Sequence, residues 1–249
     1  MKKMKVAVIG TLASGKGTQS HILSVLMGAP AVSIGDLLRD LQGEDSERGR
    51  SAKVEMAKGA FVPDGVILPL VKAWISKRPK GWIVDGFPRS IAQADACARF
   101  FKPDAVVYLE IPDAEALRRS TYRRVCSKCK TNYNLATQPP HDPQGRCDVC
   151  GGTLVRREDD APEIVERRLR HHHEVTEPLK QRFAKSRRLV LVDARDGIPE
   201  VAREVQRQLE SFMAARDRKR RIAAWCLFAT AAALSIAVLC VYTGWVLNG

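Results

Sequence analysis

The chain has 249 residues, with 41 lysines and arginines against 28 acidic residues, which gives a formal net charge of +13. A chain of this length can bury a full core, so composition excludes an intrinsically disordered chain and a small disulfide-stapled fold. The positive charge favours an anionic partner, but polyphosphates, nucleic acids and anionic membranes would all satisfy it. The apolar run Val6–Ile9 is too short for a secretory signal, so we expect the main domain in the cytosol.

Short apolar runs alternate with helical patterns along the chain. We expect helices near Lys16–Met27 and Asp113–Arg124, and continuous apolar runs between helices are typical of strands buried on both faces. The sequence therefore predicts an α/β fold with a doubly wound, five-stranded parallel sheet. The expected strands are Val6–Ile9, Ala31–Ile34, Trp82–Val84, Ala105–Leu109 and Leu189–Val192.

Two stretches interrupt this alternation. Residues 36–75 have helical patterns without a strand, and residues 126–156 are rich in Cys, Pro, Gly and Asn. Open α/β sheets build their ligand crevices from insertions at the ends of strands. We expect both stretches to be such insertions.

A glycine-rich segment directly follows the first expected strand and precedes a helix. It has the pattern G-x-x-x-x-G-K-G-T, in the context that a phosphate-binding P-loop requires. Its backbone N–H groups and the helix N-terminus can hold phosphate, while Lys16 reaches the outer phosphates. The predicted ATP-binding residues of this loop are Gly10, Ala13, Ser14, Gly15, Lys16, Gly17 and Thr18.

Four cysteines form two C-x-x-C pairs, Cys126 with Cys129 and Cys147 with Cys150. Each pair can place two thiolates on one ion through a tight turn. Four thiolates leave no open coordination position, so we expect a structural Zn²⁺. The alternatives are an iron centre or four free thiols. A nucleic-acid-binding zinc ribbon is a further reading, because arginines and lysines lie nearby.

Three motifs outside the cysteines carry a family resemblance. Gly10–Gln19, Ser33–Arg39 and Asp85–Gln93 occur in the order found in nucleoside monophosphate kinases, and the segment from Arg119 to Leu169 resembles the zinc-bearing lid of bacterial-type adenylate kinases. The resemblance implies a P-loop kinase domain over residues 1–215, with an NMP-binding insertion at 33–63 and a zinc lid at 125–160. It also implies Mg²⁺-dependent, reversible transfer from ATP to AMP, ATP and AMP or ADP as ligands, and a monomeric catalytic domain. It decides against nucleic-acid binding.

The resemblance also implies roles for individual residues. Guanidinium groups suit this chemistry because they grip two phosphate oxygens at once. Asp85 would hold the water shell of Mg²⁺, Arg119 would pack on the adenine of ATP, and Gln93 would read the acceptor base. The implied catalytic set is Lys16, Arg39, Asp85, Arg89, Arg123, Arg157 and Arg168. The implied AMP-binding set is Ile34, Arg39, Phe61, Val62, Gly86, Arg89, Gln93, Arg157 and Arg168, and Arg119 and Arg123 join the ATP-binding set.

Two residues depart from the family pattern. Ala13 stands where the family has glycine, and an alanine at positive φ would be strained by ~1 kcal/mol or more. Ile34 stands where adenylate kinases carry threonine, which removes a polar contact to the acceptor base. Two alternatives therefore stay open: a kinase that prefers UMP or CMP, and a nucleotide-binding protein without turnover.

A run of three histidines, His171–His173, follows Arg168. Adjacent helical positions point in different directions and cannot easily share one metal ion. We expect all three to be surface residues.

The C-terminal residues 222–247 contain no charged side chain. As a helix, this segment would span about 39 Å, more than the ~30 Å hydrocarbon core of a bilayer. Residues 216–221 before it are strongly basic, which places that flank in the cytosol. We therefore expect a cytoplasmic catalytic domain anchored to a membrane by one helix. A buried core helix or a homo-oligomer contact is the alternative.

Overall fold

The computed structural model describes residues 4–58, 60 and 62–218 of the chain. The chain divides into two compact units, Met1–Gln206 and Arg207–Gly249. Every named strand and helix lies in the first unit. Residues 198–218 are also helical and continue from the first unit into the second.

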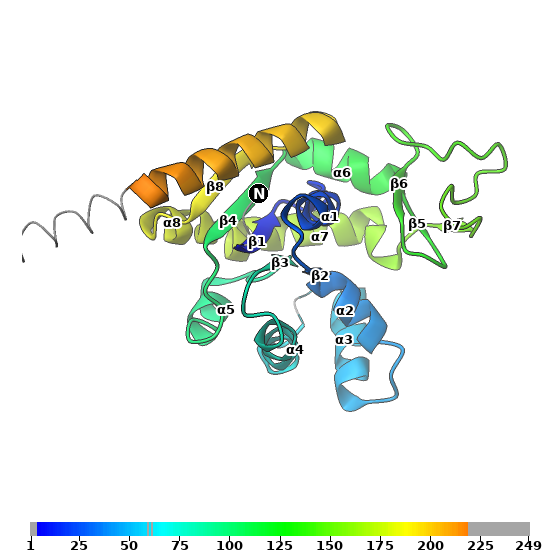
Figure 1. Ribbon diagram of the computed structural model, residues 1–249. Coiled ribbons are helices and arrows are strands. Elements are labelled where there is room, and N and C mark those ends of the chain that lie inside the picture. Colours follow the sequence, from blue (N-terminus) through cyan, green and yellow to red (C-terminus); the bar gives the residue numbers. More distant parts are fainter. Residues whose placement is uncertain (1–3, 59, 61, 219–249) are drawn as a thin grey trace, which may run out of the picture. The chain divides into compact units, whose positions relative to one another are not determined.

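A five-stranded parallel sheet forms the centre of the first unit (Figure 1). The strands lie in the order β2-β3-β1-β4-β8, and every neighbouring pair is parallel. The prediction of this sheet is confirmed. Because β1, β3 and β4 are almost completely buried, polar residues are nearly absent from their sequences. The bounds are β1 (Lys5–Gly10), β2 (Ala31–Ser33), β3 (Trp82–Asp85), β4 (Ala105–Glu110) and β8 (Leu189–Asp193).

Helices connect the strands of this sheet. The first runs from Lys16 to Met27, as predicted, and ends at Gly28 in the left-handed conformation. The helix predicted over Asp113–Arg124 ends earlier, at Tyr122, because the chain from Arg123 onward pairs with residues 132–134 in a second sheet. The bounds are α1 (Lys16–Met27), α4 (Asp64–Ser76), α5 (Ile91–Ala96), α6 (Asp113–Tyr122), α7 (Pro162–His171) and α8 (Pro178–Lys185).

The two predicted insertions are a helical pair and a small antiparallel sheet. The helices are α2 (Ile34–Leu41) and α3 (Glu47–Ala57), and each begins after a serine that accepts a hydrogen bond from the backbone of its first turn. The sheet has the order β6-β5-β7, with β5 (Arg123–Cys126), β6 (Asn132–Asn134) and β7 (Leu154–Val155). In Figure 1 these insertions are the blue helical pair and the green hairpin on the right.

The prediction that all three histidines lie on the surface is wrong for His172. Helix α7 ends at His171, and the chain continues as a π-helical turn, His172–Thr176, that turns His172 inward. His172 is buried, and its Nε2 lies 2.9 Å from the hydroxyl of Tyr108 on β4. This hydrogen bond fixes the turn after α7 against the central sheet.

Within residues 4–58, 60 and 62–218, no helix is long and apolar enough to cross a membrane. The predicted membrane helix, residues 222–247, lies outside the described residues, as do residues 219–221 of its basic flank.

The buried Tyr108–His172 pair predicts an acid-sensitive fold. Burial lowers the pKa of His172 to about 4, below the value of 6.5 that an exposed histidine has. Between these two values the unfolded chain binds a proton that the folded chain excludes, so stability is lost as the pH falls from about 6.5 towards 4. We expect the double variant Tyr108→Phe/His172→Phe to lose less stability than the wild type over this range. The difference between the two losses in free energy of unfolding should be up to about 1.4 kcal/mol per pH unit.

Urea denaturation from pH 7 to pH 4.5 measures this effect. The matched control is His21→Gln, which removes an exposed histidine from α1. Equal pH dependence in the double variant and the wild type would contradict the assignment.

Candidate active site and metal centre

The loop between β1 and α1 has the backbone geometry of a phosphate cradle. Gly10 and Gly15 have φ angles of 133° and 86°, and a Cβ on Gly10 would lie 2.0 Å from the carbonyl oxygen of Leu109. Gly15 caps α1 without a side-chain hydrogen bond, so no side chain occupies the helix N-terminus. The Nζ of Lys16 donates to the carbonyl oxygens of Gly10 (3.2 Å) and Thr11 (2.6 Å). The N–H groups of Thr11 and Ser14 donate to the carbonyl oxygens of Leu109 (3.0 Å) and Thr11 (3.3 Å), so the helix N-terminus after Gly15 is the part of the loop best suited to an anion.

A cavity of about 660 Å³ lies over this loop, and basic side chains from several elements line it. The P-loop contributes its residues from Ala13 to Thr18, and the ends of β3 and α2 contribute further polar groups. The structure thus brings most of the sequence-predicted site residues to one cavity. Those outside the P-loop are Arg39, Asp85, Gly86, Arg89, Arg119, Arg123, Arg157 and Arg168.

Carboxylates pair with several of these arginines. Arg123 Nε donates to Asp160 at 2.8 Å, and Arg168 Nη1 donates to Asp159 at 2.7 Å. Arg39 pairs with Asp36 one turn earlier on α2. Arg157 reaches Asn132 instead, at 2.7 Å, and its buried Nε has no hydrogen-bond partner in the described part of the chain. The cavity therefore keeps an excess of positive charge.

Burial makes this positive charge costly. It lowers the pKa of Lys16 to about 7, with Asp85 opposing that shift, and it lowers the pKa values of Arg89 and Arg157 to about 10. Burial acts against the charged form of Asp159 as well, but the surrounding arginines, Arg168 first, hold the pKa of this carboxyl below its usual value. An anionic ligand would offset the desolvation of these cations.

Asp85 is a buried carboxylate at the carboxyl end of β3. Burial raises its pKa, and its Oδ1 accepts no hydrogen bond from the described residues. The opposite oxygen lies beside the P-loop, 3.5 Å from the position a Cβ on Gly17 would take. A buried carboxylate with a free oxygen at a phosphate site is suited to a cation and its water shell.

Three residues predicted to line the acceptor-base pocket do not line the cavity. Ile34 and Val62 are buried in the hydrophobic core. Gln93 is also buried: its Nε2 donates to Asp64 Oδ1 at 2.8 Å, and its Oε1 accepts from the backbone N–H of Arg89 at 2.8 Å. The amide nitrogen and the amide oxygen thus each have one partner within the protein. Phe61 lies outside the described residues.

The sequence interpretation missed the loop after β8. Residues 194–199 line the cavity, and the backbone of this loop accepts hydrogen bonds from Arg119 (to Arg195, 2.8 Å) and Gln19 (to Ile198, 3.1 Å). No motif marks this loop. Its position was nevertheless predictable, because it follows a strand of the parallel sheet and so emerges at the same edge as the P-loop.

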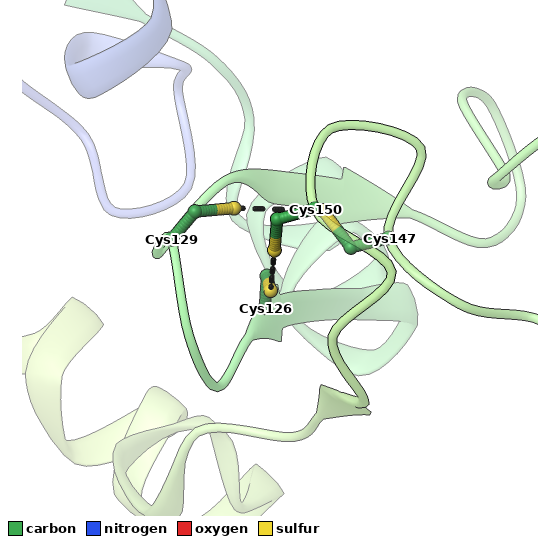
Figure 2. Close-up of side chains that lie close together, drawn as sticks. All are labelled: Cys126, Cys129, Cys147 and Cys150. Carbon is green, nitrogen blue, oxygen red and sulfur yellow. Dashed lines mark hydrogen bonds between the residues drawn. The ribbon is translucent and has the colours of Figure 1, made fainter.

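The four paired cysteines lie together at the far end of the lid hairpin (Figure 2). Their sulfur atoms all lie within 4.8 Å of one another, with Cys126 3.4 Å from Cys150 and Cys129 3.5 Å from Cys147. These distances are far longer than a disulfide bond, and four sulfurs on one tetrahedral Zn²⁺ would be about 3.8 Å apart. A Cβ on Gly152 would lie 2.8 Å from the sulfur of Cys126, so the turn needs glycine there. The cluster fits one tetrahedral metal ion.

Ala13, which stands where the family has glycine, has a left-handed backbone conformation. Its φ is 56°, which an L-residue other than glycine adopts at a cost of roughly 1–2 kcal/mol. A glycine at position 13 also increases the conformational entropy of the unfolded chain, which lowers the free energy of unfolding by about 0.4–1 kcal/mol. We therefore expect Ala13→Gly to leave stability unchanged or raise it by up to about 1 kcal/mol.

Denaturant unfolding of Ala13→Gly beside Ala184→Gly measures this strain. Ala184 is exposed within α8, where a glycine should destabilise by about 0.5–1 kcal/mol. Equal losses in both variants would show that Ala13 carries no strain.

Comparison with known proteins gives the same family as these features. The family model for adenylate kinase matches residues 8–188. The chain is 38% identical to the adenylate kinase of Caldicellulosiruptor bescii over 213 residues, which cover 83% of this chain and 99% of that protein. It is 39% identical to the adenylate kinase of Archaeoglobus fulgidus (83% and 98% covered) and 36% identical to that of Staphylococcus epidermidis (81% and 97% covered). The chain belongs to the adenylate kinase family and is a nucleoside monophosphate phosphotransferase.

Proposed function

We propose that this protein transfers the terminal phosphate of ATP to AMP, reversibly, to form two molecules of ADP. The observation that carries this proposal is the convergence of Lys16 and five arginines on the cavity over the P-loop. These arginines, at 39, 89, 123, 157 and 168, come from α2, the loop after β3, the lid and α7. Phosphoryl transfer needs positioning and charge stabilisation more than covalent participation by the protein.

The donor and acceptor phosphates divide the site between them. The P-loop N–H groups and Lys16 bind the β- and γ-phosphates of ATP, and Arg119 on α6 packs on the adenine. Arg39 and Arg89 bind the α-phosphate of AMP, each as a fork on two oxygens. Arg123, Arg157 and Arg168 stabilise the charge on the phosphate in transfer. No side chain acts as general base, because the attacking phosphate oxygen is already anionic at neutral pH.

Asp85 is the residue that would hold Mg²⁺, through its coordinated water. The buried Oδ1, which has no hydrogen-bond partner among the described residues, and the proximity of Gly17 support this assignment. When bound with ATP, Mg²⁺ neutralises phosphate charge. Held as a carboxylate by such a cation, Asp85 also counters the positive charge of Lys16.

The four cysteines would hold a structural Zn²⁺. The close approach of their sulfurs, two buried and two exposed, supports this proposal. The lid has only Tyr133 and Leu154 in its cluster besides the buried cysteines, so it lacks a core of its own. The metal would supply the stability that this small hairpin cannot obtain from apolar burial.

Acceptor assays with Arg89→Ala test the proposed reaction. We expect kcat/KM for AMP to fall by about 10²–10³, the loss typical of one preorganised charged contact in a transition state. Arg50→Ala is the matched control, because Arg50 lies on α3 with a side chain that is 67% exposed and forms an ion pair with Asp45. The wild-type enzyme is assayed with AMP, CMP, UMP and GMP. A preference for CMP or UMP would overturn the assignment of AMP as the acceptor. The absence of transfer to any of the four nucleotides would overturn the proposed reaction.

Metal analysis tests the zinc site. We expect one zinc per chain in the wild type, its loss in Cys126→Ala, and a lower melting temperature for that variant. Cys97→Ala is the control, because Cys97 is buried in the main core and should not affect zinc content. Zinc retained by Cys126→Ala, or a wild type that binds none, would contradict the assignment.

We also propose that residues 222–247 anchor the protein in a membrane. The support is the sequence: no charge over a length that spans the hydrocarbon core, preceded by a basic flank at 216–221. The full chain should then stay with the membrane pellet through an alkaline wash and be released by detergent. The double variant Leu234→Arg/Val238→Arg should be released by the wash, since each arginine costs ~2.5–3.5 kcal/mol at the helix centre. Release of the wild type by the wash would refute the anchor.

A further inference from the structure

The edge of the main sheet opposite the nucleotide cavity is strongly basic. All five strands are parallel, so the segments that precede them emerge together at this amino edge. Hydrogen bonds show that these segments are neighbours: Trp82 N donates to Met4 O at 3.1 Å, Asp104 N to Lys5 O at 2.7 Å, and Val106 N to Arg188 O at 2.8 Å. We call Lys5 and the segments 77–80, 99–102 and 185–188 the basic edge.

The basic edge has nine basic side chains and no acidic one, and Asp104 is the acidic residue beside it. Lys77, Lys80, Lys102, Lys185 and Arg187 are exposed. Among the described residues none of these five forms an ion pair, whereas Arg50, Arg118 and Arg203 on other surfaces each pair with a carboxylate. The charges of these five side chains therefore repel one another and are not offset by ion pairs within the described part of the chain.

Helix polarity accounts for part of this charge. Helices α4, α5 and α8 all end at this edge, and their free carbonyl groups attract cations within the last turn. Lys80, Lys102 and Arg188 lie beyond those turns. Arg187 has a φ of 53°, a conformation that favours glycine. An arginine at this position therefore strains the backbone, and a glycine would relieve that strain. Helix ends alone do not explain the surface.

We propose that the basic edge docks on the headgroups of an anionic lipid bilayer, with the nucleotide cavity facing away from the membrane. This inference rests on the proposed anchor, because only 15 residues separate Gln206 from Ile222. Residues 207–218 among them are helical, so this connection spans at most roughly 30 Å. Tethering converts docking into an intramolecular event at high effective concentration. Each basic side chain near an anionic leaflet adds to the attraction, so a few contacts suffice.

The orientation has a consequence for access to the site. The P-loop, the lid and helices α2 and α3 lie at the carboxyl edge of the sheet (Figure 1). Docking through the amino edge leaves these parts clear of the bilayer. It also keeps the anionic nucleotides away from the negative surface potential of the lipid.

Lysine footprinting of the full-length protein tests the docked orientation. The protein is reconstituted in vesicles of neutral phosphatidylcholine or of phosphatidylcholine with 30% phosphatidylglycerol, and acylation by a membrane-impermeant reagent is followed by mass spectrometry. We expect Lys80, Lys102 and Lys185 to react at least about threefold more slowly on the anionic vesicles, and the difference to disappear in about 1 M salt. Lys53 on α3 and Lys128 in the lid are exposed internal controls that should not change. Equal rates on both vesicles, or protection of Lys53 or Lys128 instead, would overturn the proposal.

Charge variants separate this surface from a general effect of charge. Lys80→Gln/Lys102→Gln/Arg187→Gly should restore the labelling of Lys77 and Lys185 on anionic vesicles, and the glycine should relax the backbone at 187. The matched variant Arg48→Gln/Arg50→Gln/Lys53→Gln removes three charges from α3 and should keep the protection. Neither set touches the proposed catalytic residues, so phosphoryl transfer in solution should be unchanged in both.

Two further results distinguish the possible failures. A full chain that does not stay on neutral vesicles but is protected at the basic edge on anionic ones would refute the anchor and keep the docking surface. Protection of the same lysines by added RNA at 150 mM salt on neutral vesicles, without protection by anionic lipid, would assign the edge to nucleic acid and overturn the membrane proposal.

Discussion

The desolvation of several cations in one cleft is the constraint on which the rest of the site depends. Lys16, Arg89, Arg157 and Arg168 are buried deeply enough that burial lowers the pKa of each. Asp85, Asp159 and Asp160 compensate only part of this charge. The cavity therefore has an uncompensated positive charge, and an anionic ligand would offset the free energy that its desolvation costs. The same preorganised cations can stabilise negative charge on a phosphate in transfer without reorganising. The P-loop glycines, the hairpin of the lid and the end of α7 all bring these side chains into the same cavity.

The fold was predictable wherever hydrophobic pattern and position agree. The strands β1, β3 and β4 are buried on both faces, so their sequences are continuously apolar, and the P-loop between Gly10 and Lys16 fixed the start of α1. The end of α6 was placed too late because Arg123 and Arg124 suit a helix by propensity. They pair with Asn134 and Tyr133, which lie 11 and 9 positions further along the chain, and a local sequence pattern does not report such pairing.

The residues of the candidate site were predictable where a sequence motif marks them. They were unpredictable where tertiary contacts determine the direction of a side chain. The arginines found by motif do line the cavity. The amide of Gln93, however, donates to Asp64, which is 29 positions away in the sequence, and accepts from the backbone N–H of Arg89. His172 shows the same limit: its neighbours in the sequence are exposed or half-buried, and only the π-helical turn after α7 directs it to Tyr108. The loop 194–199 has no motif, but strand polarity alone places it beside the P-loop.

Strand polarity also relates the two charged regions of the molecule. In a parallel sheet, helix N-termini gather at the carboxyl edge and helix C-termini at the amino edge. The carboxyl edge therefore has N–H groups that favour phosphate, and this chain adds half-buried arginines there, several of them paired with carboxylates, which suit a small anion in a cavity. At the amino edge Lys77, Lys80, Lys102, Lys185 and Arg187 are exposed and form no ion pair among the described residues, which suits an extended anionic surface that need not be enclosed. The two regions carry the same sign of charge, but burial and pairing distinguish the ligand that each can bind.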